Sequence, residues 1–486
     1  MEGLSGGMEL WALVPELTLA GLILLLLPLG PFLPPARKGI ATWIALMGLL
    51  AAAIESAWML TFAKRPIFLD TYAVDQFAVY FKFFAIAATA FVLLATQSHF
   101  RGRAHEGEVP ALLLITCLGI MGLAASQDLA LIALFIQLVT VGSYLLVGIA
   151  KQDRLATEAA FKMFLFSATV GAVMIYGMVL LFGLTGTLRL PELATRLPAM
   201  PVVTIMAAFF LVLAGYGFES TLVPFHTWAP DVYQGAPTPI AGFLSVGPKA
   251  AGLAVLLRTL IVAFPHNLGH WAEVFAVLAA ITMTVGNIFA LRQTSVKRLL
   301  AYSSIGQVGY MLVGVAAAER HGLAVPGMLL YLAVYLFMNL GAFLAVDAIE
   351  RQLKSDDIAQ LNGLGKRLPV TAAVLALCLL ALAGFPPFGS FVGKTYLFGA
   401  ALGAGWIWLA VVMLVNIAIS LFYYVRVLEP LYLRPAAGKP LQKEPGALRF
   451  VLIVLGIATL LSGVLPQEWV AFVTHASSLL AAVVPH

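Results

Sequence analysis

The chain has 486 residues, of which 62% are hydrophobic and 10% are charged, whereas about 25% of the residues of a soluble globular domain are charged. Its mean hydropathy is +0.98. These values exclude a soluble multidomain enzyme, a disordered chain and a nucleic-acid-binding protein. The two cysteines, Cys117 and Cys378, lie in apolar runs and indicate neither a disulfide framework nor a metal or redox centre. The composition predicts an integral membrane protein.

Apolar runs that are long enough to span a bilayer, about 20 residues each, follow one another along the chain. They are too long for barrel strands and lack the alternation of such strands. The predicted fold is therefore all-α and polytopic, with about 14 transmembrane helices, followed by a tail at 471–486 that is too short to span by itself. In chain order, the predicted helices are 10–31, 40–63, 75–97, 109–126, 128–150, 157–185, 202–225, 237–264, 270–291, 298–317, 324–348, 368–396, 402–426 and 450–470.

The start of the chain does not have the pattern of a cleavable signal peptide, because no basic segment precedes the first run and Glu2, Glu9 and Glu16 make it acidic. The basic residues of the loops predict the orientation. Loops after odd-numbered helices carry 18 Lys and Arg residues, and loops after even-numbered helices carry five. Because basic loops stay on the cytoplasmic side, we expect both termini to lie on the outer side.

Five basic residues fall inside the predicted helices: Lys82, Lys162, Lys249, Arg258 and Lys394. An ionisable group at the bilayer centre costs at least about 2.5–3.5 kcal/mol, so such groups usually face a bundle interior, pair with one another or line an ion path. Lys249 and Lys394 lie mid-helix beside glycines and prolines, which let neighbouring helices and water approach. We expect these two lysines to lie on a proton path.

Prolines predict breaks in two of these helices. Glu219 precedes Pro224 in helix 7, and Pro386 and Pro387 precede Lys394 in helix 12. Proline removes a backbone donor and disrupts the preceding turn, and broken helices at matching positions of two halves are typical of ion sites in transporters. The two breaks are five helices apart, which predicts two inverted five-helix repeats, helices 4–8 and 9–13.

The predicted organisation of the chain follows from these repeats. Residues 1–107 form three N-terminal helices, 108–265 the first repeat, 266–427 the second, and 428–486 a cytoplasmic loop, helix 14 and the tail.

Other polar residues in or near the helices leave two interpretations open. Glu158 and Lys162 are four residues apart, which favours a helix-end ion pair worth a few tenths of a kcal/mol, although a supporting role in translocation stays open. His226 follows the helix 7 break, where it could relay protons or act as a neutral hydrogen-bonding group.

Four further charges are predicted to be structural. Lys82 and Asp75 near the start of helix 3 lie within snorkelling reach of the interface. Glu16 and Arg258 lie near the outer ends of helices 1 and 8, where Arg258 is expected to be an anchor. The sequence shows no Gly-rich phosphate loop, no metal-ligand cluster and no Ser/His/Asp arrangement, so ion translocation without a cofactor or metal in this chain is the chemistry that remains.

Four motifs point to a known family. They are Thr-Leu-Val-Pro-Phe-His-Thr-Trp-Ala-Pro-Asp at 221–231 with its continuation to 239, Lys-Arg-Leu-Leu-Ala-Tyr-Ser-Ser at 297–304 with its continuation to 310, the aromatic run 331–343, and the run 382–397. In this order the motifs resemble those of the antiporter-like, proton-translocating membrane subunits of respiratory complex I, the NADH–quinone oxidoreductase.

This resemblance implies a fold of fourteen helices with inverted repeats and broken helices 7 and 12. It also implies a glutamate in helix 5 paired with a lysine in helix 7, and further lysines in helices 8 and 12. Lys249 and Lys394 match the last two. The first two positions differ, because Gln137 stands where the glutamate is expected and Glu219 stands where the lysine is expected.

The double departure suggests a rewired pair. Our hypothesis from the sequence is that Glu219 pairs with Lys249 on the next helix, and that an arriving proton frees Lys249 to pass charge toward Lys394. The alternative is a static pair in a subunit that has lost pumping. Removing one partner of a buried ion pair is strongly destabilising. Both hypotheses therefore give Glu219 a partner.

The resemblance implies a non-redox subunit of a membrane translocase, in a prokaryotic plasma membrane beside other membrane subunits. Quinone, FMN and iron–sulfur clusters are expected in those partners. Three alternatives stay open: a cation/proton antiporter subunit, a structural spacer that does not pump, and a membrane subunit of a hydrogenase-type or formate-oxidising complex.

Overall fold

A computed structural model describes residues 10–34, 37–61, 65–103, 105–265, 268–436 and 441–481. Glu2 and Glu9, on which part of the signal-peptide prediction rests, lie outside the described residues. Within the described chain, twelve helices are long and apolar enough to cross a membrane, and Val109–Ala125 and Pro369–Ala383 are shorter apolar helices. The prediction of an all-α, polytopic membrane protein is confirmed.

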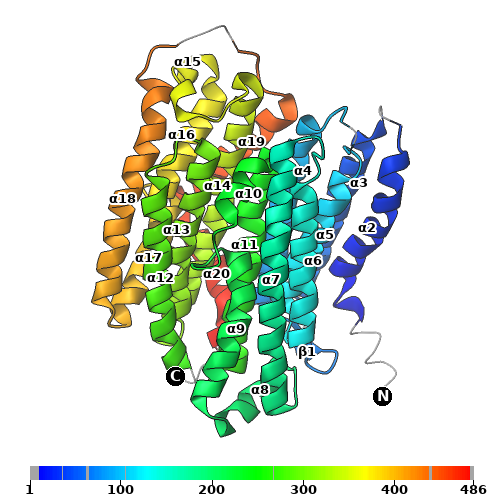
Figure 1. The fold of residues 1–486 in the computed structure, drawn as a ribbon, viewed down its shortest axis with the longest axis vertical. Helices are drawn as coiled ribbons and strands as arrows, with labels where there is room; N and C mark the ends of the chain where they lie inside the picture. Colours follow the sequence, from blue (N-terminus) through cyan, green and yellow to red (C-terminus); the bar gives the residue numbers. More distant parts are fainter. Residues whose placement is uncertain are drawn as a thin grey trace. The chain divides into compact units, whose positions relative to one another are not determined.

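The described residues form two compact units, and the first takes in residues of 1–220, 247–269 and 475–486. Its consecutive long helices pack side by side in the blue-to-cyan part of Figure 1. Its elements are α2 (Val14–Phe32), α3 (Gly39–Met59), β1 (Arg65–Ile67), β2 (Tyr72–Val74), α4 (Gln76–His99), α5 (Val109–Ala125), α6 (Leu129–Val147), α7 (Arg154–Thr185), α8 (Leu190–Arg196), η3 (Leu197–Ala199) and α9 (Val202–Ser220).

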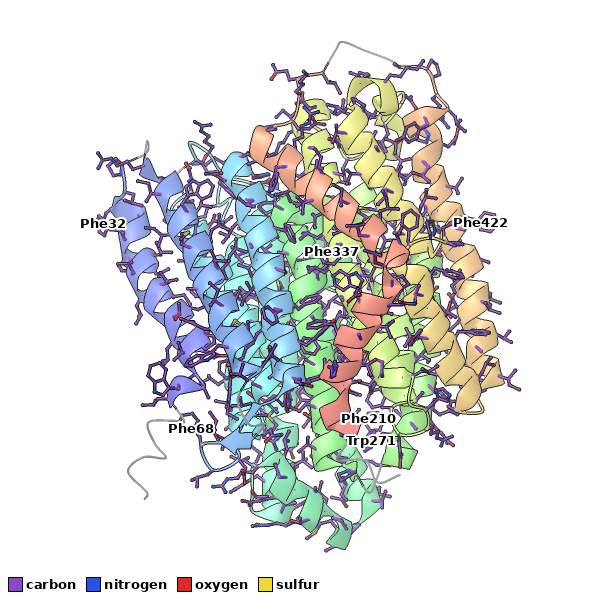
Figure 2. All side chains as sticks on the ribbon, turned by 180° about the vertical axis from the view of Figure 1, so that it is seen from behind. Phe32, Phe68, Phe210, Trp271, Phe337 and Phe422 are labelled. Atoms are coloured by element: carbon purple, nitrogen blue, oxygen red, sulfur yellow. The ribbon has the colours of Figure 1, made fainter. Side chains whose placement is uncertain are left out.

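The second unit takes in residues of 221–246 and 270–474, so that α11 (Thr238–Ala263) contributes to both units. In this unit, Phe337 of α14 packs on Trp469 of α20, with ring centroids 5.6 Å apart (Figure 2). The other elements are α10 (Ala229–Gly235), α12 (Leu268–Ala290), α13 (Val296–Ala316), α14 (Ala324–Leu353), η5 (Ile358–Gln360), α15 (Leu364–Arg367), α16 (Pro369–Ala383), α17 (Gly389–Gly403), α18 (Ile407–Tyr432), α19 (Gly446–Val464) and α20 (Pro466–Ala481), the last residues of which belong to the first unit.

The fourteen predicted runs all coincide with helices, with differences at proline-containing ends. The run 368–396 is divided between α16 and α17, and the run 202–225 ends as a helix at Ser220. As a helix, the run 450–470 stops at Val464, and Pro466 begins α20, which continues to Ala481 within the predicted tail. Proline begins a helix readily because the N–H that it lacks would have no acceptor within the helix at the first position.

A small hairpin between α3 and α4 was not predicted. Strands β1 and β2 pair antiparallel, with Ile67 opposite Tyr72. The turn between them holds Phe68, Leu69 and Asp70 at positive φ angles of 52°, 57° and 66°. The hairpin brings Tyr72 against the N-terminal helices, where its hydroxyl donates to Glu16 Oε1 at 2.7 Å.

Helix starts in the first unit are set by short acidic side chains. The carboxylates of Asp75, Asp128 and Asp153 accept backbone N–H groups at the starts of α4, α6 and α7, at 2.7–2.9 Å. Such caps pair N–H groups that have no partner within the helix. Away from the caps, the outer helices are apolar on their exposed faces as well, and exposed Phe32 and Phe422 point away from α2 and α18 (Figure 2).

Candidate functional site

The two predicted helix breaks are present, and each lies beside a charged residue. The first separates α9, which ends at Ser220, from α10, which begins at Ala229. The second separates α16, which ends at Ala383, from α17, which begins at Gly389. Thr221 and Gly384 leave the helical conformation with φ angles of 58° and 91°. Pro224, Pro386 and Pro387 lie within the breaks, as the sequence predicts.

Glu219 lies in the last turn of α9 and is 1% exposed. Its Oε1 accepts a hydrogen bond from the Thr140 hydroxyl of α6. On the other side, α11 approaches so closely that a Cβ atom on Gly252 would lie 3.0 Å from the Cβ of Glu219. The carboxyl group is therefore enclosed between α6 and α11, within the first unit.

Gln137, the residue at the expected position of the family's glutamate, does not take this place. Its amide nitrogen lies 2.9 Å from where a Cβ of Gly171 on α7 would be, so the side chain faces α7. Thr140, almost one turn further along α6, contacts Glu219 instead. Thr140 was not predicted from the sequence, because a threonine in an apolar helix usually bonds its own backbone, and the Thr140 oxygen also lies 2.8 Å from the Ile136 carbonyl oxygen.

Lys249 is fully buried in α11. It lies three residues before Gly252, and residues at that spacing share one face of a helix. Gly252 faces the end of α9, so Lys249 and Glu219 border the same helix interface. The partner that the structure describes for Glu219 is Thr140, and the pairing of Glu219 with Lys249 stays a prediction.

Pro248 leaves a backbone carbonyl of α11 without its helical hydrogen-bond donor. The segment after the first break supplies a donor in its place. Proline has no N–H, so the carbonyl of Leu244, four residues earlier, loses its usual partner. The hydroxyl of Tyr233 on α10 donates to this oxygen at 3.1 Å. The first motif therefore supplies a donor to the turn of α11 that precedes Lys249.

Lys394 lies in the second unit, on α17, and is 4% exposed. Its Nζ donates to the backbone oxygens of Leu382 and Ala383 at 2.9 and 3.1 Å. These carbonyls end α16, where the helix dipole is negative and stabilises a cation. The ammonium also lies 4.9 Å from the ring centroid of Tyr310 and 5.9 Å from that of Tyr331, distances that allow cation–π attraction.

A network of neutral side chains begins at the Leu382 carbonyl, to which Lys394 also donates, and its members were not predicted from the sequence. The Gln307 amide donates to the Leu382 oxygen at 3.2 Å and to the Tyr424 hydroxyl at 3.1 Å, and it accepts from the Tyr331 hydroxyl. The Tyr424 hydroxyl also bonds the Ser303 hydroxyl. Gln307, Ser303 and Tyr331 lie in the second and third motifs, so the motifs were the available signal.

A second group of buried polar residues adjoins the Lys394 ring contact. The Asn287 amide donates to the Tyr310 hydroxyl at 3.2 Å and to the Asn416 oxygen at 3.1 Å, and it accepts from the Tyr423 hydroxyl at 2.9 Å. Asn416 donates to Thr284 at 3.0 Å. Hydroxyl and amide groups of this kind both donate and accept, so they can pass or reorient a proton through hydrogen bonds.

The motif residues also meet at one end of the second unit. Arg298 Nη1 lies 2.7 Å from Asp231 Oδ1, which links the second motif to the segment after the first break. Lys297 Nζ lies 3.0 Å from Glu350 Oε1, and Thr238 donates to the same carboxylate. These pairs fix the starts of α10, α11 and α13 against the end of α14.

Two of the predicted supporting groups lie at the surface of this chain. Lys162 and Glu158 form the expected i,i+4 ion pair, at 3.0 Å, with side chains 40% and 54% exposed. His226 is half-buried in the first break, and its carbonyl accepts from Ala229 as α10 begins. The structure thus confirms the Glu158–Lys162 contact and leaves the roles of these residues as predictions.

The four charges predicted to be structural form two pairs within the first unit. Lys82 is fully buried, with its Nζ 2.8 Å from Glu16 Oε1. Arg258 is 1% exposed and meets Asp75 with two contacts of 2.8 Å. The expectation that Lys82 reaches the interface was wrong, because Lys82 is fully buried and the Tyr72 ring of the hairpin lies beside its ammonium.

Comparison with known proteins agrees with this arrangement. The family described as NADH:quinone oxidoreductase/Mrp antiporter, TM, matches residues 126–420. The chain is 37% identical to NADH-quinone oxidoreductase subunit N of Trichlorobacter lovleyi, over 96% of this chain and 97% of that one. It is 34% identical to F(420)H(2) dehydrogenase subunit N of Methanosarcina mazei, over 97% and 99%.

A solved structure extends the similarity to the fold. One chain of respiratory complex I from Thermus thermophilus with bound Aureothin is 31% identical, with a TM-score of 0.79 over 94% of this chain and 99% of that chain. The motifs that resembled the antiporter-like subunits are the same segments that build the two breaks and the Lys394 surroundings. The chain therefore belongs to the NADH-quinone oxidoreductase subunit N family, within the wider NADH:quinone oxidoreductase and Mrp antiporter group of transmembrane proteins.

Proposed function

We propose that this chain is a proton-translocating membrane subunit of a complex I-like NADH–quinone oxidoreductase, assembled with other membrane subunits. The observation that carries the proposal is the placement of Lys394, a buried lysine at a helix break whose described partners are two carbonyls and two aromatic rings. Membership of the subunit N family supports the same function.

The surroundings of Lys394 suit a group that gains and loses a proton. When a lysine loses its proton in an ion pair, a buried anion is left without compensation, which is costly. Carbonyls and rings carry no net charge, so Lys394 can become neutral without stranding an anion. Gln307 donates to the same Leu382 carbonyl as Lys394 and also bonds Tyr331 and Tyr424, so neutral polar groups lie beside the ammonium.

Glu219 supplies the acid of the first unit in this proposal. The family's acid is expected in helix 5, where this chain has Gln137, and Glu219 takes the position of a lysine in helix 7. Thr140 orients its carboxyl group from α6. Lys249, which borders the same interface, is the proposed recipient of the charge, and Lys394 acts in the second unit. Glu158, Lys162 and His226 stay candidates for a supporting role.

The topology that we propose has inverted repeats, 108–265 and 266–427, between the N-terminal helices and the last helix, with both termini on the outer side of the membrane. The breaks support the repeats, because each interrupts the fourth helix of its five. The excess of 18 over five basic residues supports the orientation.

The chain is proposed to contribute no redox chemistry itself. Quinone, FMN and iron–sulfur clusters belong to partner subunits, and quinone reduction there drives changes in the buried lysines and Glu219. Relatives are named for NADH or for F(420)H(2), so the electron donor is set by partners. An antiporter subunit, the alternative within the same fold group, predicts sodium-dependent transport.

The test is proton pumping by the whole reconstituted complex carrying Glu219→Gln, with electron transfer followed in parallel. We expect pumping per electron to fall while the complex remains assembled. Unchanged pumping would show that Glu219 is dispensable and would favour the static subunit. Repeating the measurement with sodium replaced by choline separates proton translocation from antiport.

A further inference from the structure

Helix α19 packs against the second break, although it lies outside both proposed repeats and beyond residues 126–420, which the family matches. It borders α14, α16 and α17, all within the second unit. Its last turn, with Ser462 and Gly463, makes the contact with the break. The break is therefore held by a neighbour that the repeats do not supply.

Gly463 approaches the backbone of the break so closely that no side chain fits between them. A Cβ atom at Gly463 would overlap the Pro387 oxygen and would lie 2.5 Å from the carbonyl carbon of Phe388. Both are backbone atoms, which cannot rotate away as the end of a flexible side chain can. Only glycine, which has no Cβ atom, lets the two backbones meet at this point.

The start of α17 meets α19 with a glycine of its own. A Cβ atom at Gly389 would lie 2.7 Å from both the backbone oxygen and the hydroxyl oxygen of Ser462. Ser462 is fully buried, and its hydroxyl donates to the Thr459 carbonyl at 2.8 Å, so this side chain stays against its own helix. Gly389 and Gly463 therefore interlock, because each lies against the backbone of the other segment.

Pro466 adds an electrostatic component to this contact. Proline has no N–H, so the Ser462 carbonyl, four residues earlier, lacks its usual helical donor. Among the described residues, no side chain caps the start of α17, and the first N–H groups of a helix have no partners within it. The carbonyl end of α19 thus lies beside the amino end of α17, and the opposite partial charges of the two helix ends favour this arrangement.

The position of α17 decides where the Lys394 ammonium lies. Lys394 is five residues after Gly389, in a helix of 15 residues that begins at the break. Its Nζ reaches the Leu382 and Ala383 carbonyls across that break, at 2.9 and 3.1 Å. The space beside the ammonium is small, because a Cβ atom at Gly384 would lie 3.1 Å from it. A small displacement of α17 therefore changes the contacts of Lys394.

We propose that Gly463 is a positioning residue for Lys394, and that α19 holds the second break in the geometry that Lys394 needs. This inference rests on the proposed role of Lys394 in proton translocation. Gly463 acts through the start of α17, which carries the lysine. The last helix before the C-terminal segment, outside both repeats, is thereby part of the translocating apparatus as well as of the fold.

The test compares Gly463→Ala with Gly446→Ala in the whole reconstituted complex. Gly446 begins the same helix, and a Cβ atom there would meet nothing within 4 Å. We expect Gly463→Ala to lower the number of protons pumped per electron several-fold, because rates fall steeply when a reacting group is displaced. Gly446→Ala should leave this ratio unchanged. Loss of folded complex alone would lower electron transfer and pumping together, so the ratio would stay the same and the positioning role would be overturned.

A second measurement follows the break directly and needs no turnover. Hydrogen–deuterium exchange of residues 384–393 is measured by mass spectrometry on the purified complex. Exchange is expected to be faster in Gly463→Ala than in wild type, because a displaced break exposes the N–H groups that begin α17, and unchanged in Gly446→Ala. Equal exchange in the two variants would overturn the contact on which the proposal depends.

Lys394→Met, measured in parallel, separates this inference from the proposed function. If Lys394→Met pumps normally, the proposed function fails, and the exchange experiment still decides whether α19 holds the break. If Lys394→Met loses pumping while Gly463→Ala retains it despite faster exchange, the positioning role of Gly463 is overturned.

Pro466→Ala is the second variant, to be used if Gly463→Ala does not assemble. The alanine N–H can donate to the Ser462 carbonyl, which draws the end of α19 away from the break without adding a clash. Faster exchange of residues 384–393 and a smaller loss of protons pumped per electron are expected. Unchanged exchange in Pro466→Ala would overturn the proposal.

Discussion

Arg258 in the first unit and Lys394 in the second are both buried cations, and they are held in opposite ways. Arg258 meets the Asp75 carboxylate twice at 2.8 Å and donates to the Ala124 carbonyl at 2.7 Å. The described partners of Lys394 are the carbonyls of Leu382 and Ala383 and two tyrosine rings. One cation is fixed by a countercharge, and the other is stabilised by dipoles.

The difference separates structure from transport. Arginine stays charged at all relevant pH values, and its fork matches a carboxylate, whereas lysine changes protonation state more readily when buried. A cation that is locked to a carboxylate joins α11 to the N-terminal helices but cannot give up its charge. A lysine that is held by dipoles at a helix end can.

The largest expected effect is on stability, from Arg258→Met. Removing one partner of a buried ion pair typically costs about 3–5 kcal/mol, because the remaining charge is left uncompensated. We expect a marked loss of thermal stability of the purified complex, or failure to assemble. Arg434→Met, which removes an exposed pair with Glu429, is the control and is expected to have little effect.

The pH dependence of stability is a second test of the Asp75–Arg258 ion pair. Burial opposes ionisation of Asp75, but the Arg258 guanidinium and the Ala78 N–H outweigh it and lower the pKa of Asp75. The ion pair therefore stabilises the fold above about pH 4, the unfolded value, and this contribution is lost as the pH falls through the lowered pKa. The stability difference between wild type and Asp75→Asn should shrink in acid, and a constant difference would contradict the pair's role.

For the cation that is held by dipoles, Lys394→Met is expected to abolish most proton pumping with a smaller effect on assembly. Methionine fills similar space, the Leu382 carbonyl keeps its bond from Gln307, and the Ala383 carbonyl loses the bond from Lys394. We expect pumping to fall at least tenfold, about 1.4 kcal/mol in the barrier, in the reconstituted complex. Lys443→Met, in the loop before α19, is the matched control. Pumping at wild-type rate with Lys394→Met would place the proton path elsewhere.

Gln307→Leu tests whether the neutral network carries function. Leucine leaves the Tyr331 and Tyr424 hydroxyls without a shared partner, at a cost of about 1–3 kcal/mol for unsatisfied buried groups. We expect a several-fold loss of pumping and a moderate loss of thermal stability. Gln307→Glu retains an acceptor, and pumping that recovers with glutamate but not with leucine would support the relay.

The smallest expected effect is that of Thr140→Val. Valine keeps the shape of threonine and removes one hydrogen bond to Glu219, which is worth about 1 kcal/mol. We expect a few-fold loss of pumping. In the Glu219→Gln background the same change should have less effect, because contacting residues couple. Equal effects in both backgrounds would show that Thr140 acts independently of Glu219.

Sequence reasoning was most accurate where burial and backbone chemistry coincide. Pro224, Pro386 and Pro387 predicted the breaks because a missing N–H cannot be restored by any fold. It was wrong for Lys82, since snorkelling is judged by distance from a helix end and the unpredicted hairpin covers that end. Gln307 and Thr140 were missed because neutral polar residues in apolar helices give no periodic signal.

The sequence by itself determined the membrane class, the fourteen apolar runs, the two breaks and the burial of Lys249 and Lys394, because hydropathy and proline chemistry act locally. Only the tertiary structure decided what each charge contacts. Whether a buried cation meets Asp75 or two carbonyls depends on which helices lie beside it, and side chains far apart in the chain supply those partners. That choice of partner distinguishes a structural ion pair from a group that can carry a proton.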